Sequence, residues 1–172
     1  LTIESGVKIL MPEEACIIVY GRLIINGTEE DPVVINPNEY SPSWGALCFV
    51  NATDSSVIIN LKITGATRGH DFTRDKAAIS GYNSDFSLQN VTVEKVKCPV
   101  FIQYGKVFIS GCKLHTDEAC DLINIKYAES AVVENCDLLG SDNYDSDGID
   151  YDRISDGIIR ENRIYNFYGD NS

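Results

Sequence analysis

The sequence predicts an all-β chain built as a solenoid of parallel strands. A short motif recurs along it: a β-branched run, a small polar pair and a closing apolar residue. These closing residues recur 21 to 30 residues apart, a loose period typical of repeat architectures. Apolar and polar residues alternate within each copy, which indicates strands and not helices. The closing residues are Ile63, Val93, Leu114, Leu138 and Ile164.

A solenoid follows because one strand of this kind cannot bury its apolar face alone. Stacked copies can, since neighbouring strands lie about 4.8 Å apart and bring equivalent side chains together. Inserts then fall into loops, so the spacing varies while the strands keep their register. With 172 residues, we expect a single domain over 1–172 with a continuous core. The repeat length predicts roughly seven coils.

The strands are expected in order along the whole chain. Residues 1–10 predict two short strands around a turn at Gly6, and 16–26 repeat that shape. A strand at 32–35 is followed by a proline-containing loop and a strand at 44–50. The longest polar insert is the loop at 67–76. Between the later motif copies, further strands are expected at 77–80, 100–103, 121–125 and 147–151.

The opening coils carry the most specific resemblance to a known family. The run LTIESGVKI, followed by GRLIINGTEEDPVVI, is similar to the N-terminal coils of many bacterial surface β-helix proteins. The segment WGALCF at 44–49 resembles the W-G-G-I-x-F coil of the same family. The chain thus resembles the right-handed parallel β-helix proteins of the pectate-lyase-like superfamily. Trp44 is expected to pack the solenoid rather than to serve as a sugar-stacking platform.

Composition excludes several classes of partner. The net charge of −12 argues against nucleic acid and against anionic membrane surfaces. No run of about 18 apolar residues is present, so we expect no insertion into a membrane. Neither end of the sequence carries an evident cap or signal peptide. Because a solenoid exposes unpaired strands at its ends, further coils or another chain are expected to cover them.

The six cysteines include no C-x-x-C pair, which counts against a zinc ribbon or a redox motif. Cys112 and Cys136 occupy the same position of neighbouring motif copies. Stacked strands would place their Cα atoms within the range of a disulfide. Buried free thiols are the alternative, because cysteine often acts as a small hydrophobic residue. The sequence leaves both open.

An acidic coil at 142–152 is the one candidate site. Aspartates this dense repel one another, and a bound cation would relieve the repulsion. Calcium takes six to eight oxygen ligands. A solvated acidic face, a calcium site and a catalytic acid/base set all remain open. The candidate calcium ligands are Asp145, Asp147, Asp150 and Asp152.

Alignment of the coils supplies the catalytic hypothesis. It sets Asn124 over Asp150 and Lys126 over Asp152. Asp150 and Asp152 would then share one strand face, about 7 Å apart, within the roughly 6.5–9.5 Å gap of an inverting carboxylate pair.

A second resemblance points to the same coil. The segment DSDGID at 145–150 is similar to the N-T-D-G-I-D segment of polygalacturonase-type glycoside hydrolases, which implies Asp147 as the first catalytic aspartate. The family's later elements, an Asp-Asp pair, Gly-His-Gly and Arg-x-Lys, are missing. Pectate lyases combine calcium with an arginine base, for which Arg153 is the candidate. The catalytic set is therefore Asp147, Asp150 and Arg153.

Two functions are expected from these observations. The first is a secreted or cell-surface β-helix module with a carbohydrate-associated binding role, or a spacer or adhesin role. The alternative is a lyase or glycoside hydrolase that acts on uronate-containing polysaccharide through coil 142–152. The sequence does not decide whether the chain is an enzyme.

Overall fold

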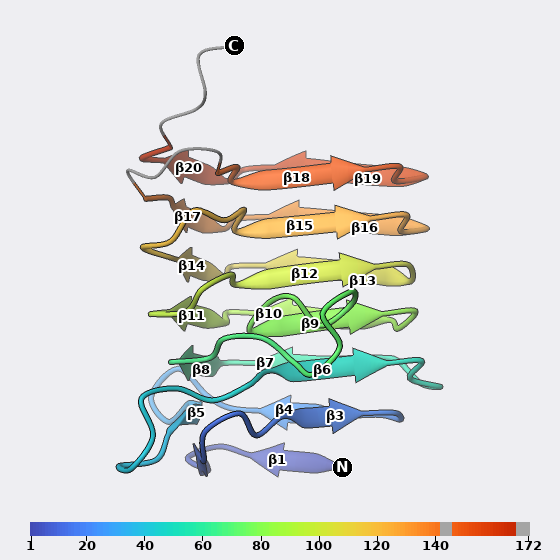
Figure 1. Ribbon diagram of the computed structural model, residues 1–172. Coiled ribbons are helices and arrows are strands. Elements are labelled where there is room, and N and C mark those ends of the chain that lie inside the picture. Colours follow the sequence, from blue (N-terminus) through green and yellow to red (C-terminus); the bar gives the residue numbers. More distant parts are fainter. Residues whose placement is uncertain (142–145, 168–172) are drawn as a thin grey trace.

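The computed structural model describes residues 1–141 and 146–167, which form a parallel β-solenoid (Figure 1). Every assigned pairing between strands is parallel, and no helix occurs among these residues. The coils stack in sequence order, with the N-terminus at one end of the stack. About six turns are formed, close to the seven predicted, and the predicted fold class is confirmed.

Each turn contributes one strand to each of three parallel sheets. Sheet A contains β1 (Thr2–Glu4), β4 (Ile24–Asn26), β7 (Ser56–Ile59), β10 (Phe86–Gln89), β13 (Lys106–Ser110), β16 (Ser130–Glu134) and β19 (Asp156–Arg160). Sheet B contains β2 (Lys8–Met11), β5 (Val33–Pro37), β8 (Leu61–Thr64), β11 (Thr92–Glu94), β14 (Lys113–His115), β17 (Asp137–Leu139) and β20 (Arg163–Tyr165). Sheet C contains β3 (Ile17–Val19), β6 (Leu47–Val50), β9 (Ile79–Tyr82), β12 (Val100–Gln103), β15 (Ile123–Lys126) and β18 (Ile149–Asp152).

The predicted register is confirmed in sheet B. The five closing residues of the motif lie directly over one another, from Ile63 through Val93 and Leu114 to Leu138 and Ile164. Four of them are fully buried, and Ile164 is exposed in the last coil described. The rows of aliphatic side chains inside the stack form one continuous core, which removes their apolar surface from water.

Trp44 belongs to this core and is not a sugar platform. Its side chain is fully buried, and its indole Nε1 donates a hydrogen bond to the carbonyl oxygen of Thr64 at 2.8 Å. A buried indole N–H needs such an acceptor, so the contact fixes the ring against the coil above.

Asparagines form the corner between sheets A and B. Asn60, Asn90 and Asn135 follow their sheet A strands with φ of 50°, 53° and 53°. Asparagine tolerates this left-handed conformation better than most residues, so the small polar pair of the motif is a corner signal. At the corner between sheets C and A, Tyr104 and Tyr127 take the same conformation, with their rings stacked 5.5 Å apart.

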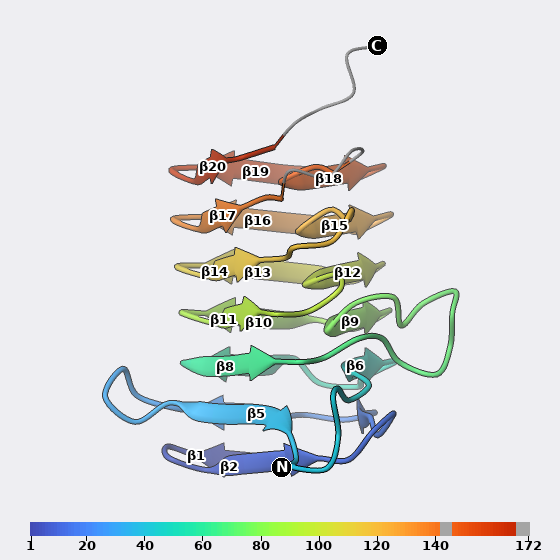
Figure 2. The same ribbon diagram turned by 60° about the vertical axis from the view of Figure 1, so that its left-hand side comes forward.

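Two loops project from the stack (Figure 2). One joins β4 to β5 over residues 27–32, and the other joins β8 to β9 over residues 65–78. The second loop contains the predicted polar insert. It covers the outer side of β6, where Ala46, Cys48 and Val50 are buried.

Cys112 and Cys136 stack in neighbouring coils as predicted, and of the two alternatives the structure shows buried free thiols. The hydrogen bond between them and burial raise the pKa of the Cys112 thiol. A disulfide instead joins Cys98 to Cys120, which precede β12 and β15.

Candidate functional site

Strand β18 places the acidic coil on the outer face of sheet C. Ile149 and Tyr151 pack against the core, so Asp150 and Asp152 point to the opposite face, as predicted. The predicted alignment with the coil before is confirmed, because Asn124 pairs with Asp150 and Lys126 with Asp152.

Protein groups compensate the charge of Asp150. The side-chain amide of Asn124 donates from Nδ2 to Asp150 Oδ2 at 2.8 Å and to Asp121 Oδ2 at 2.7 Å. The ammonium group of Lys126 lies 3.7 Å from the same Asp150 oxygen. Asp150 is therefore held by a hydrogen bond from Asn124 and an ion pair with Lys126, both on the preceding coil. Such contacts satisfy a carboxylate without a metal ion.

The other predicted catalytic residues lie around this strand. Asp147 is exposed, and its main-chain N–H donates to Asp121 Oδ1 at 3.0 Å. Arg153 forms the corner after β18 with φ 57°. Its Nε lies 3.7 Å from Asp152 Oδ1, and its guanidinium lies 5.3 Å from the centre of the Tyr127 ring. The contacts of Arg153 thus go to Asp152 and Tyr127.

The predicted calcium ligands are placed only in part. Asp145 lies outside the described residues. Within 1–141 and 146–167, no group of three or more His, Cys, Asp or Glu side chains could hold a metal ion. Asp147, Asp150 and Asp152 carry oxygen donors of the kind calcium prefers, so the calcium site stays a prediction.

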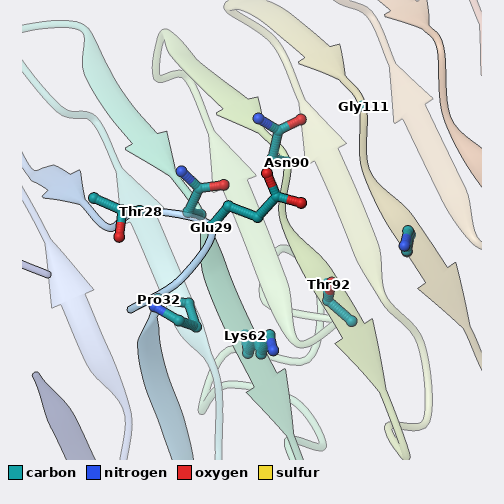
Figure 3. A pocket seen from close by; sticks show the side chains of 9 residues that line it. Thr28, Glu29, Pro32, Lys62, Asn90, Thr92 and Gly111 are labelled. Atoms are coloured by element: carbon teal, nitrogen blue, oxygen red, sulfur yellow. The ribbon is translucent and has the colours of Figure 1, made fainter. Parts of the chain in front are cut away.

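A different site lies on the outer face of sheet B. There the surface is hollowed by about 550 Å³, a volume within the range of small-molecule sites (Figure 3). Its lining is polar, with two lysines and no aromatic residue. The lining residues are Thr28, Glu29, Pro32, Asn60, Lys62, Asn90, Thr92, Gly111 and Lys113. We call this hollow the sheet B groove.

The repeat register aligns the groove's basic side chains. Thr92 pairs with Lys62 on one side and with Lys113 on the other, so the three occupy one row across β8, β11 and β14. Because neighbouring strands lie about 4.8 Å apart, the two lysines are separated by roughly 10 Å along the solenoid. Neither lysine forms an ion pair within the part of the chain that the structure describes.

The 27–32 loop forms one wall of the groove. Asn60 Nδ2 donates to the carbonyl oxygen of Gly27 at 3.0 Å, which ties the loop to the A–B corner. A Cβ on Gly27 would lie 2.4 Å from the Asn60 carbonyl oxygen, so only glycine allows this approach. Thr28 Oγ1 accepts from the Asp31 N–H at 3.0 Å and closes the turn. These two hydrogen bonds therefore hold the loop in place as a wall of the groove.

The groove continues toward the last coils. A second hollow of about 150 Å³ shares Thr92 and Lys113 with it and reaches Tyr165. Arg163 lies 4.5 Å from the centre of the Tyr165 ring. His115 lines this hollow, with Nδ1 3.0 Å from the Leu139 carbonyl oxygen and Nε2 3.1 Å from Asp117 Oδ1. Together the two hollows form an elongated surface that runs along the solenoid axis and is polar in the larger hollow and more apolar in the smaller one.

The sheet B groove was not predicted from the sequence, although a signal for it exists. Lys62, Thr92 and Lys113 each stand directly before a closing residue of the motif. Because side chains alternate along a strand, a residue at that position points to the outer face of sheet B. The three polar side chains therefore lie side by side on that face. The loop wall carries no comparable signal.

Comparison of the chain with protein-family models, with curated proteins and with solved structures found no match. Nothing helical in the described ranges has the length and apolar character needed to cross a membrane.

Proposed function

We propose that this chain is a carbohydrate-binding module of a secreted or cell-surface β-helix protein, and that it holds an extended acidic polysaccharide in the sheet B groove. One observation carries the proposal: Lys62 and Lys113 line one hollow in the same register row, two coils apart. A row of cations at a fixed repeat suits a polymer with carboxylates at a fixed repeat.

The rest of the lining supports a sugar polymer over other anions. Thr28, Asn60, Asn90 and Thr92 supply hydroxyl and amide groups beside the lysines. Such groups both donate and accept, which matches the hydroxyls of a sugar. The elongated shape favours a chain over a single sugar, because the second hollow continues the groove in the direction of the coils.

The overall charge of −12 does not oppose this ligand at the groove itself. Charges on exposed groups are screened beyond about 8 Å at physiological ionic strength. Glu29 is the one acidic residue that lines the larger hollow. Glu94 and Asp137 line the smaller one, and Asp137 stands beside Lys113 in its register row, so we expect the lysines to act mainly in the larger hollow.

The disulfide supports an extracellular or cell-surface location. Disulfides persist in oxidising compartments and are rare in the cytosol. The Cys98–Cys120 bond ties two neighbouring coils together. The resemblance of the opening coils to bacterial surface β-helix proteins favours the same location and is compatible with a spacer or adhesin role.

The direct test is calorimetric titration of the protein with polygalacturonate and with its fully methyl-esterified form. The two polymers share a backbone and differ in charge. Binding of the acidic polymer with at least tenfold weaker binding of the ester supports the proposal. Equal binding of both, or no binding of either, rejects it.

A second candidate function is polysaccharide cleavage at the acidic coil. The observation in its favour is that Asp150 and Asp152 share the outer face of β18, as an inverting carboxylate pair requires. Asp147 and Arg153 would complete the set, with calcium held by Asp145, Asp147, Asp150 and Asp152 as the cofactor of a lyase. Turnover of polygalacturonate with added calcium tests this, with Asp150→Asn as the inactive control. Absence of new reducing ends and of unsaturated products rejects it.

A further inference from the structure

A separate cavity of about 200 Å³ lies on the outer face of sheet C, the face that carries β12 and β15 in Figure 1. Typical sites for larger ligands measure about 300–1,000 Å³, so this one suits a single small molecule. It is lined by Lys76, Cys98, Val100, Phe101, Cys120, Asp121, Asn124 and Lys126. Unlike the sheet B groove, it combines an apolar wall with charged groups.

The apolar part comes from Phe101 and the Cys98–Cys120 disulfide. Phe101 is only 6% exposed although it points away from the core. Lys76 reaches the site from the 65–78 loop and places its ammonium group 5.1 Å from the centre of the Phe101 ring. In the described ranges, no carboxylate lies within ion-pair distance of Lys76. Its charge is thus available to an anion.

The side-chain oxygen of Asn124 is an acceptor that receives no hydrogen bond among the described residues. Both recorded side-chain bonds of Asn124 run from Nδ2, to the carboxylates of Asp121 and Asp150. Two carboxylate partners fix the orientation of the amide, because the reversed amide would set oxygen against oxygen. Its Oδ1 is then buried with no partner among the described residues. A buried acceptor without a donor is unfavourable, and a hydroxyl donated by a ligand would satisfy it.

The Asp121 carboxylate also lines the cavity, but each of its oxygens already accepts a hydrogen bond. Oδ2 accepts from Asn124 Nδ2 and Oδ1 from the main-chain N–H of Asp147. Lys126 also lines the cavity, and its ammonium group lies 3.7 Å from Asp150 Oδ2. Lys126 is thus paired with Asp150, and Lys76 is the lysine of the cavity that has no carboxylate partner in the described ranges.

We propose that this cavity binds a small hydroxycarboxylic acid of the size of one sugar acid. Its carboxylate lies against Lys76, a hydroxyl donates to Asn124 Oδ1, and its carbon face contacts Phe101 and the disulfide. The site is independent of the sheet B groove, because it lies on another sheet and takes a single molecule.

Glucuronate and glucose form the matched probes, since they differ only in the carboxylate. We expect glucuronate to shift the backbone amide signals of residues 100–102 and 123–125 in a heteronuclear NMR titration, and glucose to leave them unchanged. Lys76→Gln should weaken glucuronate binding at least fivefold. Lys8→Gln removes an exposed lysine that lines neither this cavity nor the sheet B groove, and this matched control should leave glucuronate binding unchanged.

Three results overturn the proposal: no shift with glucuronate, an equal response to glucose, or binding that Lys76→Gln leaves intact. The wild-type titration needs no substitution, so misfolding of a variant cannot mask a negative result. A loss of polymer binding in Lys62→Gln with intact glucuronate binding separates this site from the sheet B groove.

Discussion

Lys113 lies two coils above Lys62 in one row of sheet B, with Thr92 between them. The strand spacing sets the two residues roughly 10 Å apart, and at that separation two unit charges in water repel by only about 0.4 kcal/mol. An anion between them gains attraction from both. The parallel stacking that builds the core therefore also aligns outward charges at a regular repeat, and this alignment produces the sheet B groove.

Glu29 should oppose an acidic ligand. Its side chain extends from the loop wall over the groove in the direction of Asn90 (Figure 3). We expect Glu29→Gln to strengthen polygalacturonate binding by up to about fivefold, the equivalent of the 0.2–1 kcal/mol typical of an exposed charge pair. Calorimetry provides the measurement. Glu13→Gln removes an exposed charge away from the groove and should have no effect; an equal gain there would mean that only net charge matters.

Asn60 should act on binding through the loop wall. Asn60→Gly keeps the left-handed corner, with φ 50° in the parent, but loses the bond to the Gly27 carbonyl. We expect polymer affinity to fall several-fold, because a loosened wall must be ordered on binding. Asn135→Gly changes the equivalent corner three coils away and is the control for stability. If both variants bind equally well, the wall is not part of the site.

The Cys98–Cys120 disulfide should contribute about 3 kcal/mol to the free energy of unfolding, given its sequence separation of 22 residues. Urea unfolding of the Cys98→Ser/Cys120→Ser variant measures this loss. A thiol titration of the unfolded, unreduced protein should count four free thiols, from Cys16, Cys48, Cys112 and Cys136. Six free thiols, or an unchanged unfolding midpoint in the variant, would contradict the assignment.

The Asp150→Asn variant distinguishes polymer binding at the acidic coil on sheet C from binding in the sheet B groove. The new amide oxygen still accepts from Asn124, and only the partly exposed contact with Lys126 is lost. We expect the free energy of unfolding to fall by less than about 1 kcal/mol. Polymer affinity should change less than twofold, since β18 belongs to sheet C and not to the groove. A large loss of polymer binding would move the site to the acidic coil.

Much of the fold was predictable because the core repeats at short range. Apolar and polar residues alternate in the segments that end at Val93 and Leu138, and this alternation specifies strands. The apolar side chains become buried only when equivalent residues of successive coils stack. The alignment of Asn124 with Asp150 followed from the same repeat spacing. For the same reason Asp150 and Asp152 lie on one face of β18, as predicted.

The binding surfaces were less predictable because they depend on loops and on contacts between coils. Nothing local in the sequence places the 27–32 loop beside Lys62, and that contact depends on Gly27 meeting Asn60. The disulfide was missed because Cys98 and Cys120 lie before their strands, outside the motif that was aligned. A regular repeat fixes the strands but leaves the insertions free.

The affinity of the double variant Lys62→Gln/Lys113→Gln for polygalacturonate tests the central claim most directly. Lys97→Gln/Lys106→Gln removes the same charge from exposed positions outside the groove and is its matched control. The account predicts at least a tenfold loss of affinity, or 1.4 kcal/mol, in the groove variant and little change in the control. Equal affinities of the two variants would show that the row of lysines on sheet B does not bind the polymer.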